Sequence, residues 1–150
     1  MILDAGIEVH ELDLRSPAGM PMALARLTGL IRAHTPATIQ SWLYYADLMS
    51  LWALRMSGLR AKTRLYWGVR CSDMDQSRYR AQLRWTIAAC ARRAGEPDAV
   101  VANSFAGRDV HRRLGYAPPA FPVIVNGIDT ERFRPNDAER VVKYMQQAGV

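Results

Sequence analysis

The sequence predicts an α/β fold with a parallel sheet and helices on both faces. Short segments that are apolar, or in which apolar and polar residues alternate, are followed along the chain by amphipathic segments of roughly ten to twenty residues. An order of strand, helix, strand, helix is typical of parallel sheets, because parallel neighbours need crossover connections. Two expected strands, 99–102 and 121–125, are almost wholly apolar, as strands covered on both faces should be.

The first half of the chain is predicted to alternate in this way. Residues 7–12 alternate between apolar and polar side chains, which indicates a strand. Residues 20–33 carry leucines at helical spacing, with Pro21 in the first turn, where its ring is tolerated. A short strand over 37–43 and a helix over 46–56 follow, and Gly58 is a plausible stop for that helix.

The second half repeats the alternation. We expect a strand over 62–69 and one long helix over 75–94. After the strand 99–102, Asn103 and Ser104 can cap a helix that Gly115 ends. After the strand 121–125, Asn126-Gly127 indicates a tight turn. Thr130 can cap a short turn through Phe133, and a last helix is expected from Asn136 or Asp137 to Gln147.

Length and composition exclude several classes of protein. The chain has 150 residues, 49% of them hydrophobic and 23% charged, which suits one ordinary globular domain rather than a disordered chain. No apolar stretch reaches the ~18–20 residues of a membrane span, and the N-terminus does not resemble a signal peptide. Cys71 and Cys90 are expected to be free thiols, and the scattered histidines 10, 34 and 111 to be surface or packing residues.

Candidate binding residues follow the strands, since ligands of parallel sheets bind beyond the carboxyl ends. P-loop and dinucleotide-binding fingerprints are both missing. We therefore select residues at the strand ends as substrate-binding candidates and assign no catalytic residue and no metal ligand. The candidates are Tyr44, Tyr45, Asp47, Arg70, Asn103, Ser104, Asn126 and Gly127.

Each of these candidates also has a purely structural interpretation. Arg70 would bind a diphosphate or carboxylate, or else form a salt bridge to Asp73 or Asp75. Asp47 would orient a hydroxyl group of a ligand, but a place in the first turn of its helix is favoured. Asn103 and Ser104 are equally explained as helix caps, although the same helix N-terminus could meet an anion. Asn126 is structural first and site-lining second.

Several motifs together resemble one enzyme family. The segment 126–135, N-G-I-D-T-E-R-F-R-P, resembles the N-G-[IVF]-D-x-x-x-F-x-P signature of the retaining family-four glycosyltransferases with the GT-B fold. Residues 98–104, D-A-V-V-A-N-S, with His111 and Gly115-Tyr116, are similar to a second segment of that family. Residues 40–47 and 66–70 resemble stretches of its bacterial polysaccharide-type members. Residues 5–9 are similar to the A-G-H/I-E-V segment that is common in the family.

The resemblance implies an acceptor-side, Rossmann-like N-terminal domain over residues 1–135, with the family's first strand apparently missing. Residues 136–150 would form a helix leading toward a donor-binding domain outside this chain. The whole enzyme would move a sugar, with retention, from a nucleotide-sugar donor to a saccharide or lipid-linked acceptor. No cofactor or metal is expected, the location would be cytoplasmic, and the chain alone is expected to be inactive.

Departures from the family pattern concern two candidates. Many relatives carry a histidine where Arg70 stands here, and another where Tyr45 stands. The role of those histidines is therefore not transferred to this chain. Tyr45 could still hydrogen-bond a sugar hydroxyl or stack on a sugar ring.

The excess of arginine allows other readings. The net charge is +6, and Lys62 and Lys143 are the only lysines, so eighteen of the twenty basic residues are arginine. Codon bias would explain this. The arginines of the helix 75–94 are expected to form a solvated face, and a further hypothesis is that they contact anionic membrane lipid at the inner face of the plasma membrane. A non-catalytic domain that binds nucleic acid or a protein is the alternative function, although no nucleic-acid-binding motif is present. Self-association through an exposed sheet edge is also expected.

Overall fold

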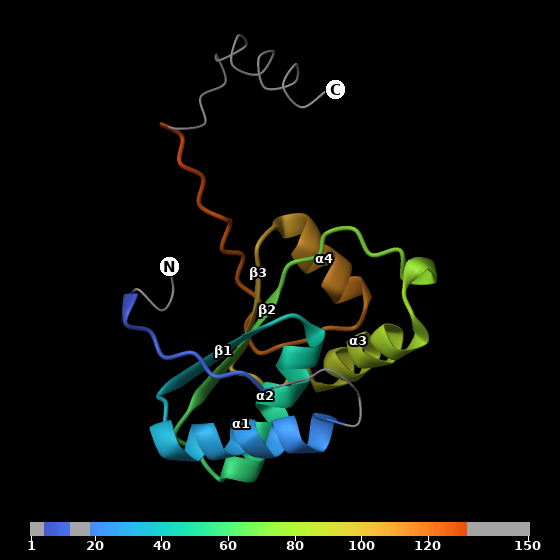
Figure 1. Cartoon of the computed structure of the whole chain (residues 1–150). Helices are drawn as coiled ribbons and strands as arrows, with labels where there is room; N and C mark the ends of the chain where they lie inside the picture. The colour runs from blue at the N-terminus through green and yellow to red at the C-terminus, as the bar shows by residue number, and fades with distance from the viewer. Residues whose placement is uncertain (1–4, 13–18, 132–150) are drawn as a thin grey trace, which may run out of the picture.

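The computed structural model describes residues 5–12 and 19–131, and it contains a parallel sheet. Strands β1 (Thr38–Trp42), β2 (Arg64–Val69) and β3 (Ala99–Ala102) lie side by side in the order β1-β2-β3 (Figure 1). Residue Thr38 pairs with Arg64, and Val69 with Ala102. The predicted α/β class with a parallel sheet is thereby confirmed.

The described helices pack on one face of this sheet. They are α1 (Met20–His34), α2 (Tyr44–Ser57), α3 (Ala81–Arg93) and α4 (Phe105–Arg113). Because each strand neighbours the next one in sequence, right-handed crossovers place α2 and α3 on the same side (Figure 1). Within the described residues, helices cover this face of the sheet, and helices on the opposite face stay a prediction.

Alternating residues of β2 form the centre of the core. Leu65, Trp67 and Val69 are almost completely buried, and they belong to one cluster with residues of α2 and α3 such as Leu54 and Ile87. In a strand, every second side chain points to the same face. The opposite face is more open: in β1, Gln40 and Trp42 remain exposed.

Three predicted helix boundaries are found where the sequence placed them. Proline stands in the first turn of α1. Gly58 ends α2 with a left-handed backbone at φ 78°, a conformation that glycine adopts without steric cost. Ser104 caps α4, because its hydroxyl accepts a hydrogen bond from the amide of Gly107 at 3.0 Å.

The prediction of one long helix over 75–94 is wrong. A short 3₁₀ helix, η3 (Gln76–Arg78), comes first, and α3 begins only at Ala81. The Asp75 carboxylate accepts hydrogen bonds from the amide and the hydroxyl of Ser77, at 3.0 Å and 2.6 Å. Such local bonds compete with helical ones, which explains the break.

Two further predicted strands are reduced in the structure. Residues 7–12 are not in a strand, so that prediction is wrong. Of 121–125, only Val123 forms a parallel bridge, to Ala102. Pro122 has no N–H to donate, although its carbonyl accepts from Ala102 at 3.0 Å.

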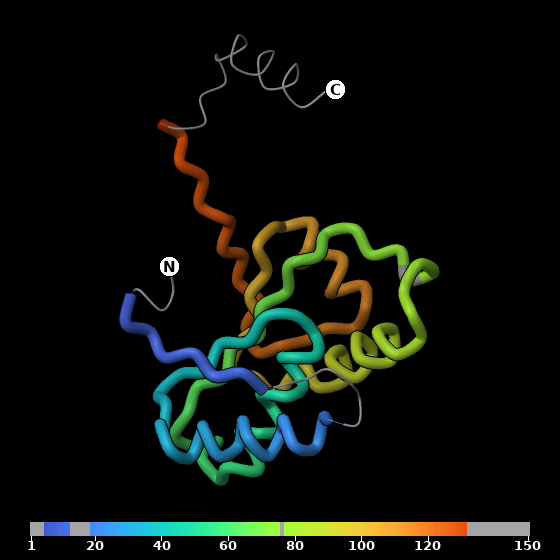
Figure 2. Tube along the Cα trace, in the orientation of Figure 1, coloured from blue at the N-terminus to red at the C-terminus, as the bar shows by residue number. Residues whose placement is uncertain are grey.

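The predicted Asn126-Gly127 turn is also absent. Gly127 has no positive φ, and residues 124–129 carry no turn. This segment runs away from the rest of the fold (Figure 2). The expected turn end at Phe133 and the expected helix to Gln147 lie outside the described residues.

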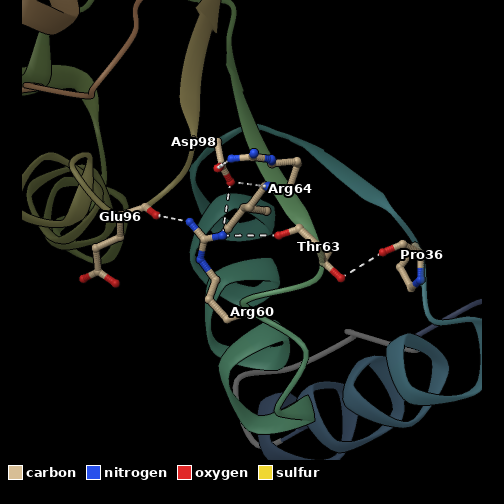
Figure 3. Close-up of polar contacts among 7 residues, drawn as sticks. Pro36, Arg60, Thr63, Arg64, Glu96 and Asp98 are labelled. Atoms are coloured by element: carbon tan, nitrogen blue, oxygen red, sulfur yellow. Dashed lines mark hydrogen bonds and ion pairs between the residues drawn. The ribbon is translucent and has the colours of Figure 1, made fainter.

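A cluster of charged residues joins the amino ends of the strands (Figure 3). The Asp98 carboxylate accepts from the Leu65 amide at 2.9 Å and forms ion pairs with Arg64 at 2.8 Å and Arg60 at 3.1 Å. Burial raises the pKa of Asp98, but these donors outweigh it and leave the pKa below the usual value. Arg60 also donates to the Glu96 carbonyl at 2.7 Å. The cluster therefore fixes the loop before β3 against β2.

Among the described residues, no helix combines the length and the apolar character needed to cross a bilayer.

Candidate functional site

A pocket of about 260 Å³ lies at the carboxyl ends of the strands. It opens on the sheet face away from Leu65 and Trp67, since Gly68 and Gln40 line it. Its position is the one expected for ligands of parallel sheets. Its lining consists of Gln40, Trp42, Gly68, Val69, Arg70, Val101, Ala102, Asn103, Ile124, Val125, Asn126 and Gly127.

Arg70 supplies the positive charge of this pocket. The side chain is exposed at the end of β2, and its Nη1 donates to Asn126 Oδ1 at 3.4 Å. The guanidinium carbon lies 5.8 Å from the centre of the Trp42 ring. Among the described residues Arg70 forms no salt bridge to Asp73 or Asp75, and Asp75 instead pairs with Arg78 at 3.3 Å. The guanidinium is therefore available to an anion.

Trp42 forms an aromatic wall that depends on Gly68. A Cβ at Gly68 would come within 2.7 Å of Trp42 Cδ1, so any larger residue would displace the indole. The indole remains 48% exposed. An exposed aromatic face beside hydrogen-bonding groups suits a sugar ring or a nucleobase. Among the eight candidates selected from the sequence, neither Trp42 nor Gln40 was included.

Leu43 joins the ends of the two strands beside this wall. Its backbone has φ 71°, an unusual value for a residue other than glycine. The Leu43 amide donates to the Gly68 carbonyl at 3.1 Å, which holds this conformation. Strained backbone of this kind clusters at functional sites. The strain thus coincides with the turn that presents Trp42 to the pocket.

Two of the sequence candidates are buried on the helix side of the sheet. Tyr44 is 6% exposed, and its hydroxyl lies 3.0 Å from His111 Nε2. Asp47 is completely buried and accepts from Ser41 Oγ at 2.6 Å, while its Oδ2 has no partner among the described residues. Burial raises the pKa of Asp47 to about 7. Neither side chain lines the pocket, and the structural interpretation of Asp47 in the first turn of α2 fits its place.

The remaining candidates divide between the pocket and helix ends. Arg70, Asn103, Asn126 and Gly127 all line the pocket, so the structure brings these four together. Ser104 serves as the cap of α4. Tyr45 lies in the first turn of α2, 39% exposed, and is not part of the lining.

His111 is a packing residue, as predicted. It is completely buried, and its Nδ1–H donates to the Gly107 carbonyl at 2.7 Å, which leaves Nε2 to accept from Tyr44. Burial lowers its pKa, which favours the neutral imidazole. The ring of Tyr116 meets it edge-on at 5.0 Å. Cys90 is buried and Cys71 is half-buried, and both are free thiols.

Comparisons with known proteins identify the family. The sequence model of the protein family described as Glycosyltransferase Family 4 matches residues 4–132 of this chain. The chain belongs to this glycosyltransferase family. A search among curated proteins finds no match.

Solved structures show the same fold. The crystal structure of Anabaena HepE in complex with UDP and glucose matches 95% of this chain with a TM-score of 0.64 and 19% sequence identity. At that identity the likeness shows the fold alone. The family-4 chain spans about a third of that protein, 36% of its length.

The pocket of this family-4 chain offers recognition rather than acid–base chemistry. Its lining contains one guanidinium, the amides of Gln40, Asn103 and Asn126, and one indole face. None of the lining residues is an aspartate, glutamate, histidine or cysteine. The described pocket can therefore bind an anion and hydrogen-bond hydroxyls, and it supplies no general base of its own.

Proposed function

We propose that this chain is the acceptor-side domain of a retaining glycosyltransferase of the bacterial polysaccharide type. The complete enzyme would transfer a sugar from a nucleotide-sugar donor to a saccharide or lipid-linked acceptor. Family membership and the position of the pocket support this function. The complex of Anabaena HepE with UDP and glucose supports a nucleotide sugar as the donor class.

The juxtaposition of Arg70, Trp42 and Asn126 carries the proposal. Arg70 would bind a diphosphate, because a guanidinium donates several hydrogen bonds to phosphate oxygens in one plane. Trp42 would stack on a sugar ring, and the amide of Asn126 would bind a hydroxyl. A lipid-linked saccharide contains both groups, the diphosphate and the ring. No cofactor is needed, since the charge of the leaving diphosphate can be balanced by protein cations and helix N-termini.

The proposal is tested by titrating the chain with a soluble, short-chain prenyl diphosphate sugar and following tryptophan fluorescence or heat. Replacing Arg70→Gln is expected to weaken binding at least about tenfold, because hydrogen bonds to charged groups contribute roughly 1.5–3 kcal/mol. The matched control is Arg84→Gln, which removes an exposed arginine of α3 outside the pocket. Equal affinities for Arg70→Gln and the unchanged chain would contradict the proposal.

We also infer that α3 contacts an anionic membrane surface. Trp85 is 70% exposed on this helix, and Arg92 is exposed seven residues later, two turns along the same side. Indole rings favour the membrane interface, and arginines are attracted to anionic headgroups. Such contact would place the domain beside a lipid-linked acceptor.

Liposome flotation tests this contact. We expect recovery with vesicles that contain phosphatidylglycerol, less recovery with neutral vesicles, and a clear loss for Trp85→Ala. Phe105→Ala, which removes another exposed aromatic side chain on α4, is the matched control and should float like the unchanged chain. Equal recovery on both lipid compositions would refute the membrane contact.

A further inference from the structure

Three potential metal ligands meet on the surface, away from the pocket described above. They are Glu8 and His10 in the segment 5–12 and His34 at the end of α1. Their ligand atoms all lie within 4.8 Å of one another, and all three side chains are exposed. None of the three lines the pocket at the strand ends. The fold therefore joins two histidines that are 24 positions apart in the sequence.

The local backbone explains why these groups converge. Residues 7–10 have no helix or turn, and in extended chain every second side chain points to the same side, which places Glu8 and His10 together. His10 Nε2 lies 3.0 Å from Glu8 Oε1. The rings of His10 and His34 are 5.7 Å apart between centroids and tilted by 55°. The two imidazoles thus approach without stacking flat against each other.

The separations are close to those of a zinc site. With Zn–N bonds of about 2.0–2.1 Å, tetrahedral geometry holds neighbouring ligand atoms roughly 3.3 Å apart. The three ligand atoms here, all within 4.8 Å of one another, lie within about 1.5 Å of that spacing. An exposed contact between Glu8 and His10 contributes little by itself in water, because solvent screens it.

We propose that Glu8, His10 and His34 bind one divalent transition-metal ion, with Zn²⁺ as the best-fitting ion. Two imidazole nitrogens and one carboxylate oxygen form a common zinc donor set, which leaves a fourth position for water. Imidazole ligands disfavour Mg²⁺ and Ca²⁺, since both ions prefer oxygen atoms.

Binding would fasten the segment 5–12 to α1. A groove runs between them, lined by Val9, Leu30 and Ala33 among others, and one of the three ligands, His10, also lines it. Arg26 also lines the groove, but it stands eight residues before His34 in α1, about 12 Å away along the helix. In this segment, which forms no strand, metal binding supplies an ordering contact in place of missing backbone pairs.

The experiment is a calorimetric titration of the tag-free chain with ZnCl₂. We expect one site per chain with a micromolar or tighter dissociation constant, unaffected by millimolar MgCl₂. His10→Ala and His34→Ala should each weaken binding by at least about tenfold, the scale on which even supporting residues of metal sites act. Glu11→Gln is the matched control: Glu11 is exposed in the same segment and lines the groove, but its carboxylate is not part of the group formed by Glu8, His10 and His34.

A second readout reports the structural effect. Hydrogen exchange of residues 5–12 should slow when Zn²⁺ is added to the unchanged chain and stay constant in His34→Ala. Circular dichroism verifies that the variants are folded. The proposal is overturned by an absence of Zn²⁺ binding, or by affinities of both histidine variants equal to that of the unchanged chain. It is equally overturned if Cys71→Ser removes the binding, because the half-buried thiol would then be the ligand.

Discussion

Asp47 shows how one buried side chain changes its chemistry with its surroundings. The residue lies in the first turn of α2, completely buried, and accepts a hydrogen bond from Ser41 at 2.6 Å. Burial penalises the charged carboxylate, which raises its pKa to about 7. The sequence indicated the helical position but not the burial, since burial depends on how α2 packs on the sheet.

Replacing Asp47→Asn is expected to remove a pH dependence of stability. An unfolded aspartate has a pKa of about 3.9, so the folded state binds this proton more tightly. Its stabilising effect is complete below the unfolded pKa and is lost as the pH rises through about 7. The free energy of unfolding of the unchanged chain should therefore fall, relative to Asp47→Asn, by about 2–3 kcal/mol between about pH 5 and pH 8.

Urea denaturation at a series of pH values measures this difference. The control is Asp73→Asn, at an exposed aspartate near the end of β2, which should change the free energy of unfolding by less than about 0.5 kcal/mol at neutral pH. Parallel curves for Asp47→Asn and the unchanged chain would show that Asp47 keeps an ordinary pKa.

The binding residues divide by how far each depends on tertiary contacts. Arg70 could be predicted, because a cation directly after a buried strand must lie at the carboxyl edge of the sheet. Tyr44 follows β1 in the same way, yet it turns into the core and reaches His111, 67 residues away. Trp42 reaches the pocket because Gly68 on the neighbouring strand leaves room for its ring. Pairing of this kind is not visible in one sequence.

At the scale of elements, periodicity locates helices and buried strands but does not show the breaks within them. The helix 20–33 is found as Met20–His34, and the strand 99–102 has the predicted bounds. The apolar stripe of 75–94 continues across a break in the helix. The break arises because Asp75 and Ser77 make local hydrogen bonds that the periodicity does not reveal. The sequence did contain a sign of this break, because aspartate and serine favour turns and helix caps.

A strand forms only where a neighbouring strand pairs with it, which is why two predicted strands are shorter or absent in the structure. Residues 7–12 alternate like a strand, but the structure gives them no ladder. In 121–125, Pro122 lacks a donor, and the pairing with β3 shrinks to the bridge at Val123. An alternating pattern shows that a segment is compatible with a sheet, and only a neighbouring backbone completes one.

At the scale of the whole molecule, the two ends of the sheet differ in structure. The carboxyl ends carry the open pocket with Arg70, whereas the amino ends are joined by the charged cluster around Asp98. The α/β class followed from the order of elements. The exposure of one sheet face in the described residues could not be derived from that order. It depends on the strand order β1-β2-β3, which one sequence does not specify.

The cluster at the amino ends should contribute to global stability. Asp98 is 17% exposed and accepts from the Leu65 amide and two arginines, so Asp98→Asn leaves these donors without a charged acceptor. We expect the free energy of unfolding at neutral pH to fall by about 1–3 kcal/mol, measured by urea denaturation. Asp75→Asn, at an exposed carboxylate that bonds only within its own turn in the described residues, should change it by less than about 0.5 kcal/mol.

The pH dependence separates a charge effect from a simple loss of shape. Because the folded pKa of Asp98 is lowered, its contribution is present above the unfolded pKa of about 3.9 and is lost as the pH falls through the lower folded value. The difference between the unchanged chain and Asp98→Asn should therefore shrink in acid. A difference that stays constant down to about pH 3 would instead mean that the substitution disturbs packing, and that the ion pairs with Arg60 and Arg64 contribute nothing to the stability of the fold.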